Sequence, residues 1–176
     1  MNHTLKIIAF FLLGISTLQA QNEVYTSPSE VKISDTTFVN LRDYSNDFVY
    51  DMKYATEDNF LKTKVYDCAE CMLRLKTVKA LIAANKDFQK KGYKIKLYDC
   101  YRPLDIQKKM WEIVSNSIYV ADPKKGSIHN RGGAVDISLV DVTGKEVDMG
   151  TSFDFFGIMA SHNFKQLSKD ILSNRK

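Results

Sequence analysis

Residues 74–99 constrain the fold most, because a helical pattern is followed directly by a strand pattern. Apolar residues recur in residues 74–91 with a period near 3.6, and lysines fill the positions between them. Gly92 then provides a residue that commonly follows the end of a helix. Residues 94–99 alternate strictly, which places Ile95 and Leu97 on one face. The sequence therefore predicts a helix over residues 74–91 and a half-buried strand over residues 94–99.

The predicted strand leads into the sequence Asp99-Cys100-Tyr101-Arg102-Pro103. Pro103 suits the first turn of a further helix, whose apolar stripe would comprise Ile106, Met110, Ile113 and Val114. Arg102 then lies where strand meets helix, and its guanidinium could bind a carboxylate or a developing oxyanion in forked geometry. A purely structural ion pair with Asp99 explains Arg102 equally well. The sequence leaves both interpretations open.

Three further segments have recognisable patterns. Residues 48–54 alternate like a half-buried strand, and residues 164–174 are predicted to form a helix. Residues 134–140 also alternate, with Val135, Ile137 and Leu139 expected toward the core and Asp136 and Ser138 on the opposite face.

Residues 126–136 place an imidazole and a carboxylate seven positions apart across a glycine turn. A catalytic zinc ion is typically held by three protein ligands and keeps one position for water. His129 and Asp136 would supply two such ligands, and Gly132 and Gly133 allow the backbone to approach a ligand closely. Taken singly, His129 could be a surface histidine and Asp136 a carboxylate that caps a neighbouring group. Together with the glycines they favour a metal site.

The N-terminus is typical of a secretory signal peptide. Lys6 precedes an apolar run over residues 7–15, and Leu18-Gln19-Ala20 resembles a cleavage site. The run is too short to span a bilayer, and no cysteine near Ala20 could receive a lipid. We expect a signal peptide over residues 1–20, an exposed arm over residues 21–37 and an exported chain, periplasmic or secreted, without stable membrane insertion after cleavage. An uncleaved membrane anchor is the alternative.

The remainder is expected to form one domain, because it contains no repeats and no Pro- or Gly-rich linker. The formal charge is +4, and the lysines are scattered without interleaved aromatic pairs, which argues against a nucleic-acid partner. Cys68, Cys71 and Cys100 are an odd number, and a single C-x-x-C is weak evidence for a redox or zinc site. We expect buried thiols or one structural disulfide, with Cys100 either partnered or in the core. The oligomeric state stays open.

Five blocks of sequence stand in the order found in one enzyme family. They comprise residues 50–60, 99–103, 126–132, 134–136 and 149–154. From about Phe38 to the C-terminus the chain resembles the zinc D-alanyl-D-alanine dipeptidases. The resemblance implies an α+β single domain over residues 38–176, with an antiparallel sheet, packed helices and a zinc cleft on the exposed face of the sheet.

The resemblance also implies roles for individual residues. His129 and Asp136 correspond to two zinc ligands, Arg102 to the arginine that stabilises the transition state, and Ser127 and Asp154 to residues of the substrate pocket. The family's third zinc ligand and its general base come from a C-terminal Glu-x-x-His element, which this chain lacks. His162 is interpreted as an ordinary residue of the pocket edge or surface. We therefore expect the domain to be C-terminally incomplete, through a frameshift or early stop, with an open sheet edge and an apolar groove.

The implied function is zinc-dependent hydrolysis of the small dipeptide D-Ala-D-Ala in cell-wall precursor or peptidoglycan metabolism, impaired by the absent ligand and base. One alternative is a zinc D-alanyl-D-alanine carboxypeptidase acting on peptidoglycan stems. Another is a non-catalytic binder of cell-wall peptide, in which Arg102 and Ser127 hold a carboxylate. The block over residues 54–60 favours the dipeptidase.

Overall fold

The computed structural model describes residues 32–176, so the predicted signal peptide and residues 21–31 of the predicted arm lie outside the described residues. Ile33–Lys176 form one compact unit. Residues 32–37 are exposed, yet residues 35 and 37 accept backbone hydrogen bonds from Lys76 and Leu75 at the start of the long helix. Residues 35–37 are therefore attached to the body of the unit.

The central sheet has three strands in the order β2 (Val49–Tyr50), β4 (Tyr93–Asp99) and β5 (Asp136–Asp141). β4 and β5 are antiparallel, whereas β2 runs parallel to β4. β1 (Phe38–Asn40) and β3 (Met72–Arg74) form a separate antiparallel pair. The predicted α+β class is confirmed, but the central sheet is mixed, because the connection from β2 to β4 passes through a helix and returns in the same direction.

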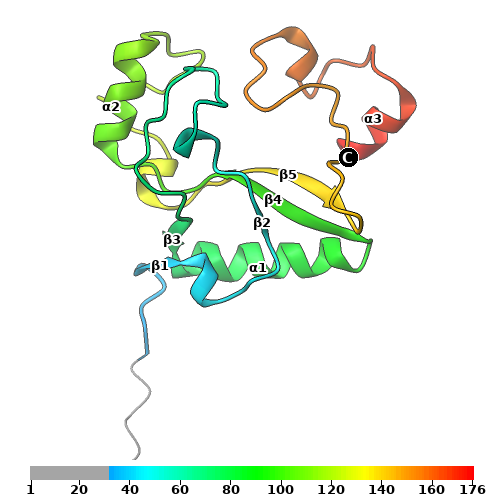
Figure 1. Cartoon of the computed structure of the whole chain (residues 1–176), viewed down its shortest axis with the longest axis horizontal. Coiled ribbons are helices and arrows are strands. Elements are labelled where there is room, and N and C mark those ends of the chain that lie inside the picture. The colour runs from blue at the N-terminus through cyan, green and yellow to red at the C-terminus, as the bar shows by residue number, and fades with distance from the viewer. Residues whose placement is uncertain (1–31) are drawn as a thin grey trace, which may run out of the picture. The chain divides into compact units, whose positions relative to one another are not determined.

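That helix is α1 (Leu75–Gln89), which lies along one face of the sheet (Figure 1). Its predicted position is confirmed, and Gly92 follows it with a φ of +83°. Buried Asn85 joins α1 to the strands, since its Oδ1 accepts a hydrogen bond from the Ile95 amide and its Nδ2 donates to the carbonyl of Asp47. The main core lies between α1 and the sheet; its fully buried members include Leu41, Leu73, Val78, Ile95 and Leu97.

The predicted helix after Pro103 is α2 (Leu104–Ile113), which packs on a second core around Tyr54, Tyr66 and Val120. Ile106 and Met110 are buried as expected, whereas Ile113 is 48% exposed. The helix predicted over residues 164–174 is shorter, since α3 spans Lys169–Asn174. Its start is set by Ser168, whose side chain accepts a hydrogen bond from the Ile171 amide. Figure 1 shows α2 and α3 on the side of the sheet away from α1.

The alternation predicted for residues 134–140 is wrong at two positions. Ile137 is 43% exposed, and Ser138 is 7% exposed. In the described part of the chain β5 is an edge strand of the sheet, and Ile137 lies before the part of β5 that pairs with residues 145–147, so it keeps contact with solvent. Ser138 is instead covered by Tyr98 and Glu146, with which it interacts.

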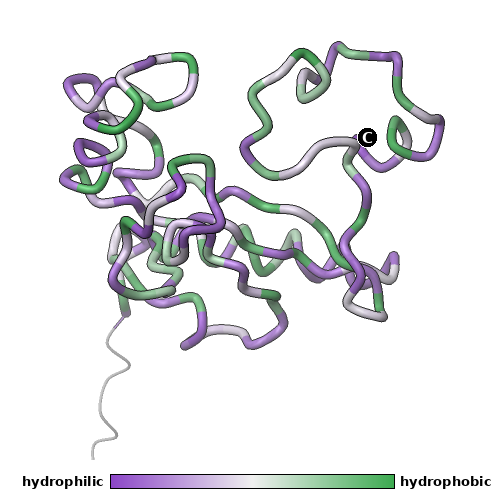
Figure 2. The backbone as a smooth tube through the Cα atoms, turned by 45° about the horizontal axis from the view of Figure 1, so that its top comes forward, coloured by the Kyte–Doolittle hydropathy of each residue, from purple (hydrophilic) through white to green (hydrophobic). Residues whose placement is uncertain are grey.

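The predicted open edge is only partly present, because backbone hydrogen bonds join Leu139 and Asp141 of β5 to Val147 and Lys145. Two hollows adjoin the remainder of the edge. One, of about 540 Å³, is lined by Ile137, Ser138 and residues 146–153, and the other, of about 560 Å³, by Ile137, Leu139 and the C-terminal residues. Large apolar side chains are exposed nearby in the C-terminal segment, which carries hydrophobic stretches in Figure 2; they include Phe155, Phe156, Ile158 and Met159. Within residues 32–176 no helix is long and apolar enough to cross a membrane.

Candidate metal centre

The candidate site lies where β4 ends and β5 begins. Asp99 is the last residue of β4, Asp136 is the first residue of β5, and the two are paired in the sheet. His129 comes from a short 3₁₀ turn, His129–Arg131, that precedes β5. Asp99, His129 and Asp136 place one ligand atom each within 4.8 Å of one another. The structure therefore brings His129 and Asp136 together, as the sequence predicts, and adds Asp99 beside them.

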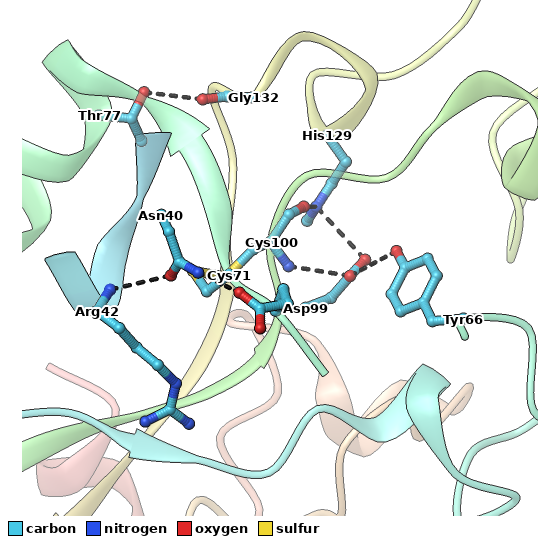
Figure 3. The surroundings of a disulfide bond; sticks show 10 residues. Asn40, Arg42, Tyr66, Cys71, Thr77, Asp99, Cys100, His129 and Gly132 are labelled. Atoms are coloured by element: carbon cyan, nitrogen blue, oxygen red, sulfur yellow. Dashed lines mark hydrogen bonds and ion pairs between the residues drawn. A yellow bond between two sulfur atoms is a disulfide. The ribbon is translucent and has the colours of Figure 1, made fainter. Parts of the chain in front are cut away.

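The His129 ring is oriented by a backbone contact. Its Nδ1 lies 2.8 Å from the carbonyl oxygen of Cys100, which can only accept, so Nδ1 carries the proton (Figure 3). In the neutral ring Nε2 then keeps its lone pair, and it lies 3.4 Å from Oδ1 of Asp136, to which the charged ring can donate a hydrogen bond. This is the arrangement in which a histidine binds a metal through one nitrogen while the other is held by an outer partner.

The pKa of His129 is set by two opposing effects of its surroundings. Burial opposes protonation, but hydrogen bonding and attraction from Asp136, with further attraction from Asp99, outweigh it and raise the pKa of His129 above its ordinary value. The metal-free site therefore attracts a positive charge, as a site with two nearby carboxylates should.

Asp99 is close to His129 but is fully engaged elsewhere. Its Oδ1 accepts hydrogen bonds from the Tyr66 hydroxyl at 2.7 Å and from the Cys100 amide at 2.9 Å. Its Oδ2 accepts two from Arg102, through Nε at 3.1 Å and Nη2 at 2.6 Å. With both oxygens occupied, Asp99 serves to hold Arg102 and is a poor candidate for a third ligand.

The structural interpretation of Arg102 is therefore confirmed, and a functional one is compatible with it. Arg102 is 8% exposed, and its Nη1 also donates to Oε1 of Gln107 at 3.1 Å. Although burial disfavours the charge, Asp99 raises the pKa of Arg102 further above its ordinary value. Its Nη2 lies 3.9 Å from Oδ2 of Asp136, so the guanidinium remains cationic beside the His129–Asp136 pair.

Asp154 belongs to the same electrostatic environment. Its Oδ2 accepts a 2.5 Å hydrogen bond from the Tyr54 hydroxyl, which connects residues 100 positions apart. Burial, together with the charges of Asp136 and Asp99, raises the pKa of Asp154, although the Tyr54 hydrogen bond and Arg102 oppose this. Asp154 also lines an open hollow of about 400 Å³ with Lys53, Asp58 and several phenylalanines.

Ser127 contacts the loop of the metal pair. Its amide donates to Oδ1 of Asn130 at 2.6 Å, and its Oγ accepts from the Asn130 amide at 3.4 Å. Nδ2 of Asn130 in turn donates to the carbonyl of Arg102 at 2.7 Å. Ser127 thus supports the turn that carries His129, and its role as a substrate contact stays a prediction.

Gly132 allows this turn to pack against β1 and β3. Its φ is +65°, and a Cβ atom there would lie 2.3 Å from Phe38 Cε1. Its carbonyl accepts hydrogen bonds from the Arg74 amide and the Thr77 hydroxyl, both at 3.0 Å (the latter in Figure 3). The turn is therefore attached to the start of α1 as well as to Arg102.

Of the alternatives for the cysteines, the structure shows one structural disulfide. Cys71 and Cys100 are bonded to each other and fully buried, while Cys68 is free and exposed. Cys68 and Cys71 of the C-x-x-C sequence therefore do not form a redox or zinc site together. His162 is exposed, in agreement with its interpretation as an ordinary residue.

Sequence reasoning missed Tyr54, Gln107 and the carbonyl of Cys100 as parts of the site. Tyr54 lies within the block over residues 50–60, which offered a signal for it. The Cys100 carbonyl offered none, because every residue has a carbonyl and only the fold selects the one that accepts a hydrogen bond.

Comparison with known proteins agrees with this geometry. Residues 34–176 match the peptidase M15 family, described as D-ala-D-ala dipeptidase. The chain belongs to this family. It is 37% identical to the D-alanyl-D-alanine dipeptidase of Escherichia coli (strain K12) over 123 residues, which cover 69% of this chain and 64% of that protein. It is 29% identical to the enzyme of the same name from Enterococcus faecium, with 72% and 73% of the two chains covered.

The family to which this chain belongs is thus a peptidase family. The match spans slightly less than two thirds of the length of the Escherichia coli protein. In the structure, the Arg102 guanidinium lies beside two residues, His129 and Asp136, that could hold a metal ion.

Proposed function

We propose that this protein hydrolyses D-Ala-D-Ala with a zinc ion held by His129 and Asp136, in cell-wall precursor or peptidoglycan metabolism. The observation that carries the proposal is the His129 ring, whose Nδ1 is held by the Cys100 carbonyl and whose Nε2 faces Asp136. The relatives from Escherichia coli and Enterococcus faecium are both named as dipeptidases for this substrate, which supports the proposal.

The donor set fits zinc, which binds imidazole nitrogen and carboxylate oxygen readily. When bound, zinc would lower the pKa of a water molecule and polarise a peptide carbonyl. In the part of the chain that the structure describes, His129 and Asp136 are the two ligands left available, because Asp99 is taken up by Tyr66, Cys100 and Arg102.

The other site residues match the charges of a zwitterionic dipeptide. The Arg102 guanidinium is suited to stabilise negative charge that develops on the carbonyl oxygen, since it is already fixed by Asp99 and needs no reorganisation. The Asp154 carboxylate is suited to the substrate ammonium group, which would also favour the ionised form of Asp154. Ser127 would contribute a hydroxyl at the pocket edge.

We further propose that residues 1–20 direct export and that the mature chain acts in the periplasm or outside the cell. The buried Cys71–Cys100 disulfide supports an oxidising compartment.

Release of free D-alanine from D-Ala-D-Ala by purified residues 21–176 with added zinc tests the proposal. Zinc-dependent release that is absent in the His129→Ala variant is the expected result. Release from a peptidoglycan stem peptide but not from the dipeptide would indicate a carboxypeptidase. Binding of the dipeptide without any release would indicate the non-catalytic alternative, and no binding at all would contradict every version.

A further inference from the structure

The Cys71–Cys100 disulfide lies directly beside the candidate metal ligands. It joins the residue before β3 to the residue after β4, and both half-cystines are fully buried. The ladder between β4 and β5 shifts register after Leu97 and ends at the pair Asp99–Asp136. Cys100 is therefore the first residue that the central sheet no longer holds.

The backbone of Cys100 contacts both neighbouring side chains of the site. Its amide donates to Oδ1 of Asp99 at 2.9 Å, and its carbonyl accepts from Nδ1 of His129 at 2.8 Å (Figure 3). The position of the Cys100 carbonyl, in the peptide unit shared with Tyr101, thus determines which nitrogen of His129 is protonated and how the ring faces Asp136.

Few other interactions hold this peptide unit in place. The N–H of the same unit, which belongs to Tyr101, donates to the carbonyl of Met72 in β3 at 3.1 Å. The Arg102 amide donates to the carbonyl of His129 at 3.2 Å, but that bond belongs to the turn whose position is in question. The disulfide is the covalent restraint between this corner and the body formed by β1 and β3.

We propose that the Cys71–Cys100 disulfide is a positioning element that holds the Cys100 carbonyl against His129 and so presents Nε2 to the metal. The expected effect on zinc affinity rests on the proposed metal site. Without the disulfide the carbonyl moves relative to the turn, the two neutral tautomers of His129 become mixed, and Nε2 is less often available. Loss of such an outer partner typically weakens metal binding by about 10- to 100-fold.

The test compares zinc affinity in the full mature chain and in three variants. The double variant Cys71→Ala/Cys100→Ala removes the disulfide and leaves Cys68 without an intramolecular partner. Cys68→Ala keeps the disulfide and controls for loss of a cysteine. Leu81→Ala removes a buried side chain of α1 and controls for reduced stability in the same core. The double variant should lose about 10- to 100-fold in affinity by calorimetric titration, and both controls should keep the parent value.

A second readout decides the inference without metal. Imidazole ¹⁵N shifts of the metal-free protein at alkaline pH report the tautomer of His129. The parent and both controls should show the Nδ1-protonated form, and the double variant a mixture. An unchanged tautomer in a folded double variant would overturn the positioning role. If the parent shows this tautomer but binds no zinc, the proposed function fails while the positioning of His129 stands.

Discussion

Asp154 is the site residue whose negative charge is proposed to bind the ammonium group of the dipeptide. It is held by the Tyr54 hydroxyl, and burial together with Asp136 and Asp99 disfavours its ionised form. A substrate ammonium would relieve this cost. We expect Asp154→Asn to weaken binding of D-Ala-D-Ala by about 10- to 100-fold, because one hydrogen bond to a charged group is lost. Calorimetry or chemical-shift titration measures this whether or not the chain turns the substrate over.

Asp58→Asn is the matched control for this change. Asp58 lines the same hollow as Asp154 but pairs with Lys53 in solvent, with its side chain 77% exposed. It should leave dipeptide binding unchanged. Equal losses in both variants would mean that a diffuse negative potential, and not Asp154, attracts the substrate.

Gly132 has a structural role, in which the cost of a positive φ can be separated from the cost of contact with Phe38. Gly132→Ala forces a side chain onto a φ of +65° and places its Cβ against Phe38. Gly144 has a φ of +84°, and nothing lies within 4 Å of the place that a Cβ atom would take, so Gly144→Ala carries only the backbone cost. We expect about 1 kcal/mol of destabilisation for Gly144→Ala and clearly more for Gly132→Ala, measured by chemical denaturation. Equal values would show that Phe38 moves aside freely.

At the level of elements, the segment that follows β2 is joined to β4 by charged side chains, in addition to the backbone pairing of the two strands. Asp51 lies between two cations, with Lys96 at 2.8 Å and Lys53 at 3.1 Å. Burial would raise the pKa of Asp51, but hydrogen bonds from Lys96 and Lys53 outweigh it and hold the pKa below the ordinary 3.8. A lowered pKa in the folded state means that this contribution to stability is present above pH 3.8 and is lost as the pH falls through the folded value.

Asp51→Asn should therefore lower the free energy of unfolding at neutral pH by about 1 kcal/mol, since partial exposure screens the pair. The difference from the parent should shrink as the pH falls below 3.8. Urea denaturation over a series of pH values measures it. A difference independent of pH would mean that Asp51 acts through packing and not through its charge.

The elements predicted best from sequence are those with a long, regular pattern. The sequence predicts α1 and β4 nearly to their bounds, because fifteen helical residues and a seven-residue strand repeat the signal many times. The strand predicted over residues 48–54 is shorter in the structure. β2 has two residues, since the chain leaves the sheet and enters a 3₁₀ turn at Lys53–Ala55. The prediction for Ile137 is wrong because its exposure depends on β5 being an edge, and strand order is not visible in an alternation pattern.

The candidate site shows the same limit. His129, Asp136 and Arg102 are side chains in recognisable blocks, and the structure brings them together. The engagement of Asp99 by Tyr66 and the disulfide between Cys71 and Cys100 connect residues 33 and 29 positions apart, respectively. No local pattern predicts such pairs, because Cys71 and Cys100 meet in the main core and Tyr66 reaches Asp99 from the second core.

For the molecule as a whole, the strength of metal binding depends on how many protein ligands reach the ion. Of the group Asp99, His129 and Asp136 in residues 32–176, Asp99 is already bonded to Tyr66, Cys100 and Arg102, which leaves His129 and Asp136 as ligands. A zinc site in a hydrolase typically has three protein ligands. We therefore expect this chain to bind zinc measurably but weakly in calorimetric titration. Imidazole added to the buffer should tighten binding to the protein, after correction for free zinc complexes, because it can occupy the position of a third nitrogen ligand.

The same titration of the Asp136→Asn variant distinguishes zinc binding at His129 and Asp136 from nonspecific zinc binding elsewhere on the protein. With one of two protein ligands changed, zinc binding and its response to imidazole should both disappear. Tight binding by the parent that ignores imidazole would instead mean that a third protein group completes the site. Sedimentation at the same zinc concentrations would then show its source, because a group from a second copy requires a zinc-dependent dimer, whereas a group from the same chain leaves a monomer.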